Sequence, residues 1–270
     1  MKPISIIIRA SGEKTLGALV NQINKFKTKD DDLVILDDTL SFEKKLHNSF
    51  LEAIRLNNEF ALIIDADILL SCNIRKLIDT CIIKLNNDDL GFGLKLFDKF
   101  YGSIKYRGIH VYRVSMLHEI LDFLPEEGKE LRPESFIKEK AKEFGYHWRN
   151  NISDKIVGLH DYFQNYEDIY YKFFIRAVRS NTDVEKLKSR FESIKYDDDY
   201  KVALKGLNDG LLYQFEGNNK AKILEKYFKL NKKLSPSDFY KKNTELLLYY
   251  EILKNMGFIK LIELKLKKNI

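Results

Sequence analysis

The sequence predicts an α/β fold in which an open, mixed and mainly parallel sheet is covered by helices on both faces. Three largely apolar runs lie within the first 64 residues, and the two segments between them carry apolar residues at helical spacing. Strands that alternate with helices of this length imply right-handed crossover connections. Ligands of such sheets bind at the carboxyl ends of the strands, so the residues after each run are the first candidates for a site.

The predicted strands cover residues 4–8, 33–36 and 60–64. The first of these runs is β-branched apart from Ser5, the pattern of a strand buried on both faces. Helices are predicted over residues 13–26 and 42–56, because apolar residues recur there every three or four positions.

Later segments predict shorter elements and a change of texture. Residues 91–97 and 104–114 alternate more nearly every second residue, which predicts shorter strands of mixed direction. A helix is expected over residues 133–144, with Gly145 as its C-cap. From about Tyr166 the chain is rich in Lys, Glu, Leu and Tyr, typical of helices. We therefore expect an α/β domain over residues 1–165 and a helical C-terminal region over residues 166–270.

The composition is that of a packed globular protein of 270 residues, 44% of them hydrophobic. The 46 basic and 40 acidic residues are interspersed, so the net charge of +6 gives little support to a nucleic-acid partner, and none is expected. Cys72 and Cys81 lack the spacing of a zinc site. The first apolar run is too short for a signal peptide, and no run approaches the roughly 20 apolar residues of a membrane span. A cytoplasmic protein is expected.

The Lys-rich C-terminal stretch LIELKLKKNI allows two interpretations. Basic helices here, with apolar side chains at Leu247, Leu248, Ile252 and Leu253, would allow peripheral contact with an anionic membrane surface. Alternatively, such a helix packs on the α/β domain and leaves its lysines in solvent.

The segment ALIIDADILL carries the strongest chemical signal, because Asp65 and Asp67 interrupt an apolar stretch at the end of a predicted strand. Burying a carboxylate is costly unless it is paired or binds a cation, and residues at this spacing can reach one ion. Mg²⁺ or Mn²⁺ suits oxygen ligands of this kind. The alternative is that both acids lie in a loop and cap a helix that starts near Ser71.

Further acids follow the other two predicted strands. Glu13 comes after the first strand, and Asp37 and Asp38 end the second. Because the ends of parallel strands meet at one edge of a sheet, these carboxylates are expected to converge there with Asp65 and Asp67. The alternative is that Asp37 and Asp38 are ordinary turn and N-cap acids.

Three segments together, SIIIRASGE, VILDDTLS and ALIIDADILL, resemble the family 2 glycosyltransferases in order and spacing. The resemblance covers roughly the first 165 residues and implies the GT-A fold, a nucleotide-binding αβα sandwich. It implies that Glu13 and one of Asp37 or Asp38 approach the nucleotide base and ribose. It also implies that Asp65 lies near ribose and metal and that Asp67 ligates the metal.

The loop after the first strand departs from the family pattern, since Arg9, Ala10, Ser11 and Gly12 stand where the family often has a Pro-Thr-Tyr-Asn-like run. We count Arg9 and Ser11 with the nucleotide-binding candidates. Arg9 has two interpretations: a cation that faces the phosphates, or a partner of one of the neighbouring acids.

Two later segments carry the remaining candidates. LRPESFIKEKAKEFGYHW resembles the family segment with the catalytic carboxylate, which makes Glu134 the candidate base and Glu130 the next. Glu134 at the start of a helix is equally suited to cap the helix dipole. His160, in KIVGLHDYF, matches the family's late metal-binding histidine, and the alternative is a structural histidine that Asp161 orients. The other histidines have no comparable context.

The aromatic stretch DYFQNYEDIYYKFF, which follows His160, would suit stacking on the sugar rings of an acceptor. The alternative is the buried face of a helix. Trp148 is likewise either a lining residue of an acceptor cleft or a core residue.

The predicted function is a metal-dependent, inverting transfer of a sugar from a nucleotide sugar, with a UDP-sugar favoured. The acceptor is expected to be a saccharide or glycolipid, as in the synthesis of surface polysaccharides. Two alternatives remain open, a nucleotidyltransferase of similar fold and a non-enzymatic protein that binds a polyanion or nucleic acid.

Overall fold

A computed structural model describes residues 2–37, 40–71, 73–130, 132–179, 183–194, 197–212 and 250–252. The described residues form two compact units. Unit 1 comprises those within 2–125, 133–162 and 250–252, and unit 2 those within 126–132 and 163–212.

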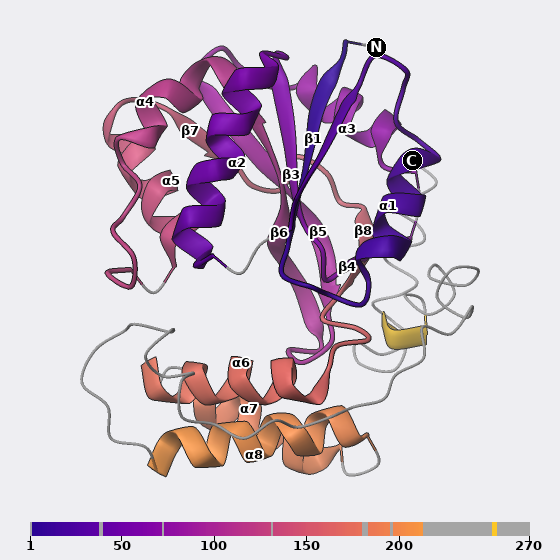
Figure 1. The fold of residues 1–270 in the computed structure, drawn as a ribbon, viewed down its shortest axis with the longest axis vertical. Helices are drawn as coiled ribbons and strands as arrows, with labels where there is room; N and C mark the ends of the chain where they lie inside the picture. Colours follow the sequence, from indigo (N-terminus) through magenta and orange to yellow (C-terminus); the bar gives the residue numbers. More distant parts are fainter. Residues whose placement is uncertain are drawn as a thin grey trace. The chain divides into compact units, whose positions relative to one another are not determined.

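Unit 1 is built on a mixed sheet of eight strands in the order β2-β1-β3-β6-β5-β8-β4, with β7 paired to β5 (Figure 1). Four strand pairs are parallel, namely β1 with β2 and β3, and β5 with β7 and β8. Three pairs, β3 with β6, β5 with β6 and β4 with β8, are antiparallel. The strands are β1 (Ile4–Ala10), β2 (Asp32–Asp37), β3 (Phe60–Asp65), β4 (Ile68–Leu70), β5 (Asp89–Asp98), β6 (Ser103–Arg113), β7 (His147–Arg149) and β8 (Ile156–His160).

Helices cover both faces of this sheet, since the side chains of β1 alternate between two hydrophobic clusters. Ile6 and Ile8 belong to the cluster that α1 and α3 complete, whereas Ile7 belongs to the cluster completed by α2, α4 and α5. The helices of unit 1 are α1 (Leu16–Asn24), α2 (Phe42–Leu56), α3 (Arg75–Ile82), α4 (Leu117–Leu121) and α5 (Pro133–Glu143), with a 3₁₀ turn at Val114–Met116. The predicted α/β class with a mixed, mainly parallel sheet is confirmed.

Local differences from the prediction have clear causes. The strand predicted over residues 33–36 is β2 at the edge of the sheet, with the side chains of its first and last residues exposed. Strand β4 was not predicted, because three residues are too few to show a period. The alternative of a helix that starts near Ser71 is wrong, since α3 begins at Arg75.

Unit 2 contains three helices, α6 (Tyr166–Arg179), α7 (Val184–Ser193) and α8 (Asp198–Leu212). Gly206 and Gly210 let α8 approach α6 closely, since a Cβ at residue 206 would lie 2.4 Å from the carbonyl oxygen of Tyr170. Tyr170 and Phe174 are buried in this packing, so part of the aromatic stretch forms a helix core.

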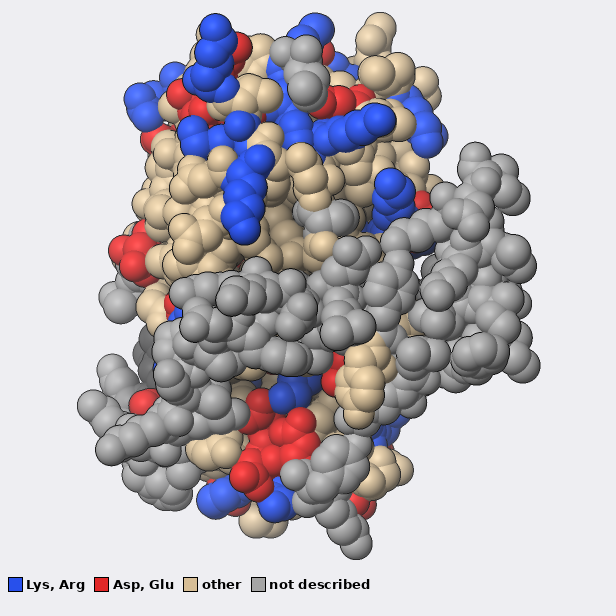
Figure 2. Space-filling view, turned by 90° about the vertical axis from the view of Figure 1, so that its right-hand side faces the viewer, with Lys and Arg blue, Asp and Glu red and all other residues tan. Residues whose placement is uncertain are grey.

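In the part of the chain that the structure describes, every helix is too short or too polar to span a bilayer. The predicted membrane-facing positions Leu247, Leu248 and Leu253 lie outside the described residues, so peripheral membrane contact stays a prediction. On the face shown in Figure 2, the basic side chains are interspersed with acidic and uncharged ones, as the composition indicates.

Candidate active site at the ends of strands β1 and β3

The parallel pairing of β1 with β2 and β3 brings the predicted donor-side residues to one edge of the sheet. Arg9 is level with Asp65 of β3, and Ala10 is level with Asp37 of β2. In the loop after β1, Asp37 Oδ1 accepts a hydrogen bond of 3.2 Å from the Gly12 amide. Glu13 Oε2 accepts one of 2.5 Å from the Ser11 amide. These predicted residues therefore lie together; Asp38 lies outside the described residues.

Lys45 of α2 contacts the start of this loop and was not predicted. Its Nζ donates a hydrogen bond of 2.6 Å to the Ala10 carbonyl oxygen and a second one to the Ser11 hydroxyl. The side chain is buried. A buried ammonium that binds the backbone in this way fixes where β1 ends and the loop begins.

Arg9 joins two of the predicted acids. Its Nε lies 2.8 Å from Asp65 Oδ1 and its Nη2 lies 2.9 Å from Glu134 Oε1, while the guanidinium lies over the ring of Phe42. Burial alone would lower the pKa of Arg9, but the charges of Asp65 and Glu134 outweigh it and raise that pKa. Of the two interpretations of Arg9, the pairing with acids is the one observed.

Glu134 lies in the first turn of α5, and its side chain is 17% exposed. Its Oε1 is shared between Arg9 and His110, whose Nδ1 lies 3.3 Å away. Burial would raise the pKa of Glu134, but His110 and Arg9 hold it well below its usual value. The carboxylate is therefore ionised at neutral pH. No described residue donates a hydrogen bond to its second oxygen, Oε2.

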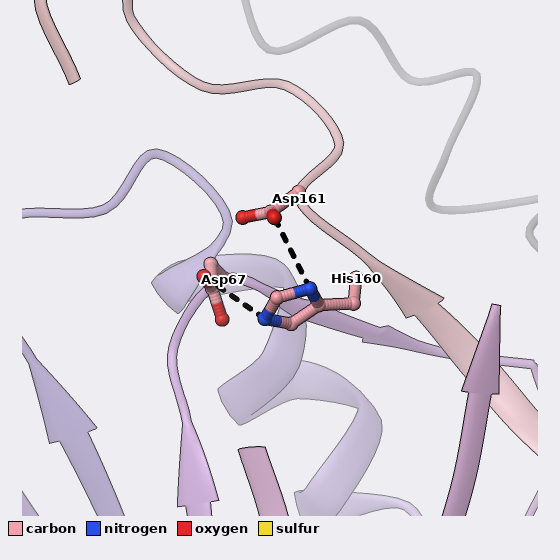
Figure 3. Close-up of side chains that lie close together, drawn as sticks. All are labelled: Asp67, His160 and Asp161. Carbon is pink, nitrogen blue, oxygen red and sulfur yellow. Dashed lines mark ion pairs between the residues drawn. The ribbon is translucent and has the colours of Figure 1, made fainter. Parts of the chain in front are cut away.

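A second group of charges gathers around His160, at the junction of β4 and β8 (Figure 3). Its Nε2 lies 3.5 Å from Asp67 Oδ2, and its Nδ1 lies 3.2 Å from Asp161 Oδ2. The antiparallel pairing of β4 with β8 sets Ile68 opposite His160, which brings Asp67 and Asp161 together. A Cβ at Gly158 would lie 2.3 Å from the Leu69 carbonyl oxygen, so only glycine allows this approach.

Asp98 closes this group from the end of β5. Its side chain is fully buried, and its Oδ2 lies 3.0 Å from His160 Nδ1 and 3.1 Å from Arg107 Nη1. Burial lowers the pKa of His160, but Asp161 and Asp67 raise it to about 10. The imidazole is thus protonated at neutral pH when no metal is bound, and its charge balances the surrounding carboxylates.

Asp67, His160 and Asp161 could hold a metal ion, because one ligand atom from each lies within 4.8 Å of the others. Carboxylate oxygens with an imidazole nitrogen fit a divalent ion such as Mn²⁺, with Mg²⁺ less suited to the imidazole. Binding requires His160 to release its proton. The predicted ligands Asp67 and His160 are brought together, whereas Asp65 is bound to Arg9 and is not a member of this group.

Four charged or titratable residues around the two groups were not predicted as site residues: Asp98, Arg107, His110 and Lys138. Asp98 is the last residue of β5, as Asp65 is of β3. Searching for acids at strand ends, as was done for Asp37 and Asp65, would therefore have found it. His110 interrupts the apolar run GIHVYR, which is a weaker signal. Neither signal shows which strands are neighbours in the sheet.

No family model matches the chain, and no curated protein matches it. Solved structures do. TarS from S. aureus (residues 1–349) matches 94% of this chain and 81% of its own at 13% identity and a TM-score of 0.42. A glycosyltransferase involved in glycosylation of the major capsid of PBCV-1 matches 58% and 92% at 12% identity and a TM-score of 0.39.

A protein described as a glucose-1-phosphate thymidylyltransferase from Bacillus anthracis matches 54% of this chain and 86% of its own, at 12% identity and a TM-score of 0.35. Because all of these identities and TM-scores are low, the assignment of function rests on the geometry of the site.

Proposed function

We propose that the chain is a metal-dependent, inverting glycosyltransferase of the hexosyltransferase type that takes a nucleotide sugar, with a UDP-sugar favoured, as its donor. One observation carries the proposal. Asp65 ends β3 and Asp67 lies on the turn to β4, so this short segment contacts both the group that could hold a metal ion and the carboxylate suited to act as a base. Asp67 contacts His160, and Asp65 shares Arg9 with Glu134.

The donor would lie along the sheet edge formed by the loop after β1. Ser11, Glu13, Asp37 and Asp38 are assigned to the base and ribose, and Arg9 holds Asp65 at this edge. Asp67 and His160 are assigned to Mn²⁺ or Mg²⁺, with Asp161 as an additional ligand from the geometry, and Asp65, which Arg9 holds, is assigned to the ribose beside the metal. A bound cation would stabilise the negative charge that develops on the diphosphate leaving group.

Glu134 is assigned as the base. Its Oε2 takes the proton of the acceptor hydroxyl, whose oxygen forms the bond to the anomeric carbon as the bond from that carbon to the diphosphate breaks. Arg9 holds Oε1 and keeps the carboxylate ionised, so the group is ready to accept a proton. The acceptor is proposed to be a saccharide or glycolipid, in a cytoplasmic step of surface polysaccharide synthesis.

The first test measures the thermal unfolding midpoint with UDP, with and without Mn²⁺. We expect UDP to stabilise the chain only when Mn²⁺ is present, by about 2.7 kcal/mol at 100 times its Kd. Asp67→Ala should abolish this effect. Asp154→Asn, at an exposed carboxylate paired with Lys95, is the matched control and should retain it.

Stabilisation by an oligonucleotide alone, steeply weakened by salt, would instead indicate a polyanion-binding protein. Metal-dependent stabilisation by a nucleoside triphosphate in place of UDP would indicate a nucleotidyltransferase.

The second test separates the base from the donor site. Glu134→Gln should retain the Mn²⁺-dependent effect of UDP and lose about 100-fold or more in turnover, measured as transfer or hydrolysis of a panel of sugar nucleotides. Glu130→Gln is the control, because Glu130 was the second candidate for the base. Unchanged turnover in Glu134→Gln, or an equal loss in Glu130→Gln, contradicts the assignment.

A further inference from the structure

His110 of β6 and Lys138 of α5 lie behind Glu134 and have no part in the reaction proposed above. Lys138 follows Glu134 by one turn of α5. Its Nζ lies 3.4 Å from His110 Nε2, and His110 Nδ1 lies 3.3 Å from Glu134 Oε1. The three side chains therefore form a row that begins at the ammonium and ends at the carboxylate.

The chemistry of the first group gives this row a direction. A lysine ammonium can only donate hydrogen bonds, so His110 Nε2, which faces it, must be the acceptor. Burial lowers the pKa of His110, so the ring is neutral at physiological pH and carries a single proton. That proton must be on Nδ1, the nitrogen that faces Glu134. Nδ1 is buried and makes no hydrogen bond of good geometry with any described residue, and the carboxylate oxygen that it faces is Glu134 Oε1, 3.3 Å away.

Packing keeps the imidazole in this orientation. The ring is 98% or more buried and makes edge contacts with Tyr112 and Trp148, at centroid distances of 6.1 and 5.4 Å. A Cβ at Gly93 would lie 3.2 Å from the His110 ring, so the strand beside it leaves room for an imidazole and little more. The ring cannot turn its Nδ1 away without moving these neighbours.

Lys138 is unusual in its surroundings. Its Nζ lies 3.8 Å from the centroid of the Trp148 ring, and no carboxylate of the described residues forms an ion pair with it. Desolvation lowers its pKa to about 8 despite the attraction of Glu134. A cation that is partly buried without a carboxylate partner opposes folding, and groups of this kind concentrate at functional sites.

The charged and titratable groups that face Glu134 come from four elements. Arg9 comes from β1, His110 and Tyr112 from β6, and Lys138 from α5, while Asp65 of β3 acts through Arg9. The cations favour the ionised carboxylate, and Lys138 is the one that binds neither acid directly. Its effect on Glu134 therefore passes through His110 and through space.

We propose that His110 and Lys138 are positioning residues for the base: Lys138 fixes the tautomer of His110, and the Nδ1–H of His110 holds Glu134 Oε1 so that Oε2 faces the acceptor hydroxyl. The proposal rests on the function proposed above. It adds two residues that touch neither donor nor acceptor and act through a third. Their removal should change the ionisation and the orientation of the Glu134 carboxylate and leave the binding of the donor unchanged.

The experiment compares Lys138→Met, Lys138→Arg and His110→Phe with the wild type, in turnover against pH at saturating donor. In Lys138→Met and His110→Phe we expect kcat to fall about 10-fold or more, with the KM for the donor nearly unchanged. The acid limb of the kcat profile should move to higher pH, because loss of a cation or a donor makes the carboxylate easier to protonate. Lys138→Arg, which keeps a donor-only cation, should restore both.

Lys140→Met on the same helix is the matched control, because Lys140 forms a surface ion pair with Glu143 and should leave both parameters unchanged. Lys138→Met should unfold at or above the wild-type temperature, since an apolar chain replaces a poorly solvated ammonium. A purely structural role would lower kcat without moving the acid limb, and that result would overturn the proposal.

A second readout is independent of turnover. The side-chain carboxyl of Glu134 is followed by NMR in protein labelled with ¹³C-glutamate, with its resonance identified by its loss in Glu134→Gln. Lys138→Met should raise the pH midpoint of this resonance, and an unmoved midpoint overturns the proposal. If the wild type transfers no sugar from any donor, the function proposed above fails, and this midpoint alone decides whether Lys138 and His110 control Glu134.

Discussion

At the scale of single residues, each group of acids in the candidate site contacts a cationic side chain at its centre. Arg9 lies between Asp65 and Glu134, and His160 lies among Asp67, Asp98 and Asp161. Buried carboxylates without such partners would oppose folding by several kcal/mol. The pairing supplies the positive charge that these carboxylates need when no metal or diphosphate is bound.

Asp98 is expected to act on the metal site through His160. Its fully buried carboxylate binds Nδ1 and thereby turns Nε2 toward Asp67. Partners of this kind typically change metal affinity by about 10- to 100-fold. Asp98→Asn should weaken Mn²⁺ binding by a factor in this range, measured by calorimetry on the chain without donor. Asp88→Asn, at an exposed site, should leave the Kd unchanged; an unchanged Kd in Asp98→Asn would show that His160 needs no such partner.

At the scale of elements, the sequence predicted those parts whose signal is local. Helix α2 was predicted with its observed bounds from the spacing of its apolar residues. The structure adds the reasons for those bounds, since Ser41 caps the first turn and Asn57 ends the helix in a left-handed conformation. The acids at the ends of β2 and β3 were predicted at one edge because parallel strands share their carboxyl ends. These local signals were sufficient to locate Asp37 and Asp65.

The parts that were missed depend on contacts between distant elements. Strand β8 lies between β5 and β4, so Asp98 is level with His160 although 62 residues separate them. His110 and Glu134 likewise meet only when α5 packs on the sheet. Because no local pattern reports strand order or helix packing, the partners of His160 and Glu134 could not be predicted from the sequence.

At the scale of the whole molecule, the ion pairs of Arg9 and His160 with the acids of the site lie within unit 1. A further buried pair, Asp31 with Arg75, ties β1 to α3 in the same unit. Burial would raise the pKa of Asp31, but hydrogen bonds from the Thr28 and Ile4 amides and from Arg75 lower it. The acid stability of unit 1 therefore depends on carboxylates in both the core and the site.

The resulting pH dependence has a definite sign for Glu134. Its pKa in the folded chain lies well below the unfolded value of about 4.3, so its stabilising effect is present above that value and is lost as the pH falls toward the folded pKa. The unfolding temperature of the wild type should exceed that of Glu134→Gln between about pH 5 and 7, and the difference should shrink steadily as the pH falls below about 4. Calorimetry or circular dichroism from pH 2.5 to 7 measures the difference.

Glu139→Gln, at an exposed position of the same helix, should follow the wild type throughout. If the difference in unfolding temperature between wild type and Glu134→Gln stays constant with pH, the pKa of Glu134 is not lowered on folding. Arg9 and His110 would then not stabilise the ionised carboxylate, and Glu134 would contribute to stability through its packing alone.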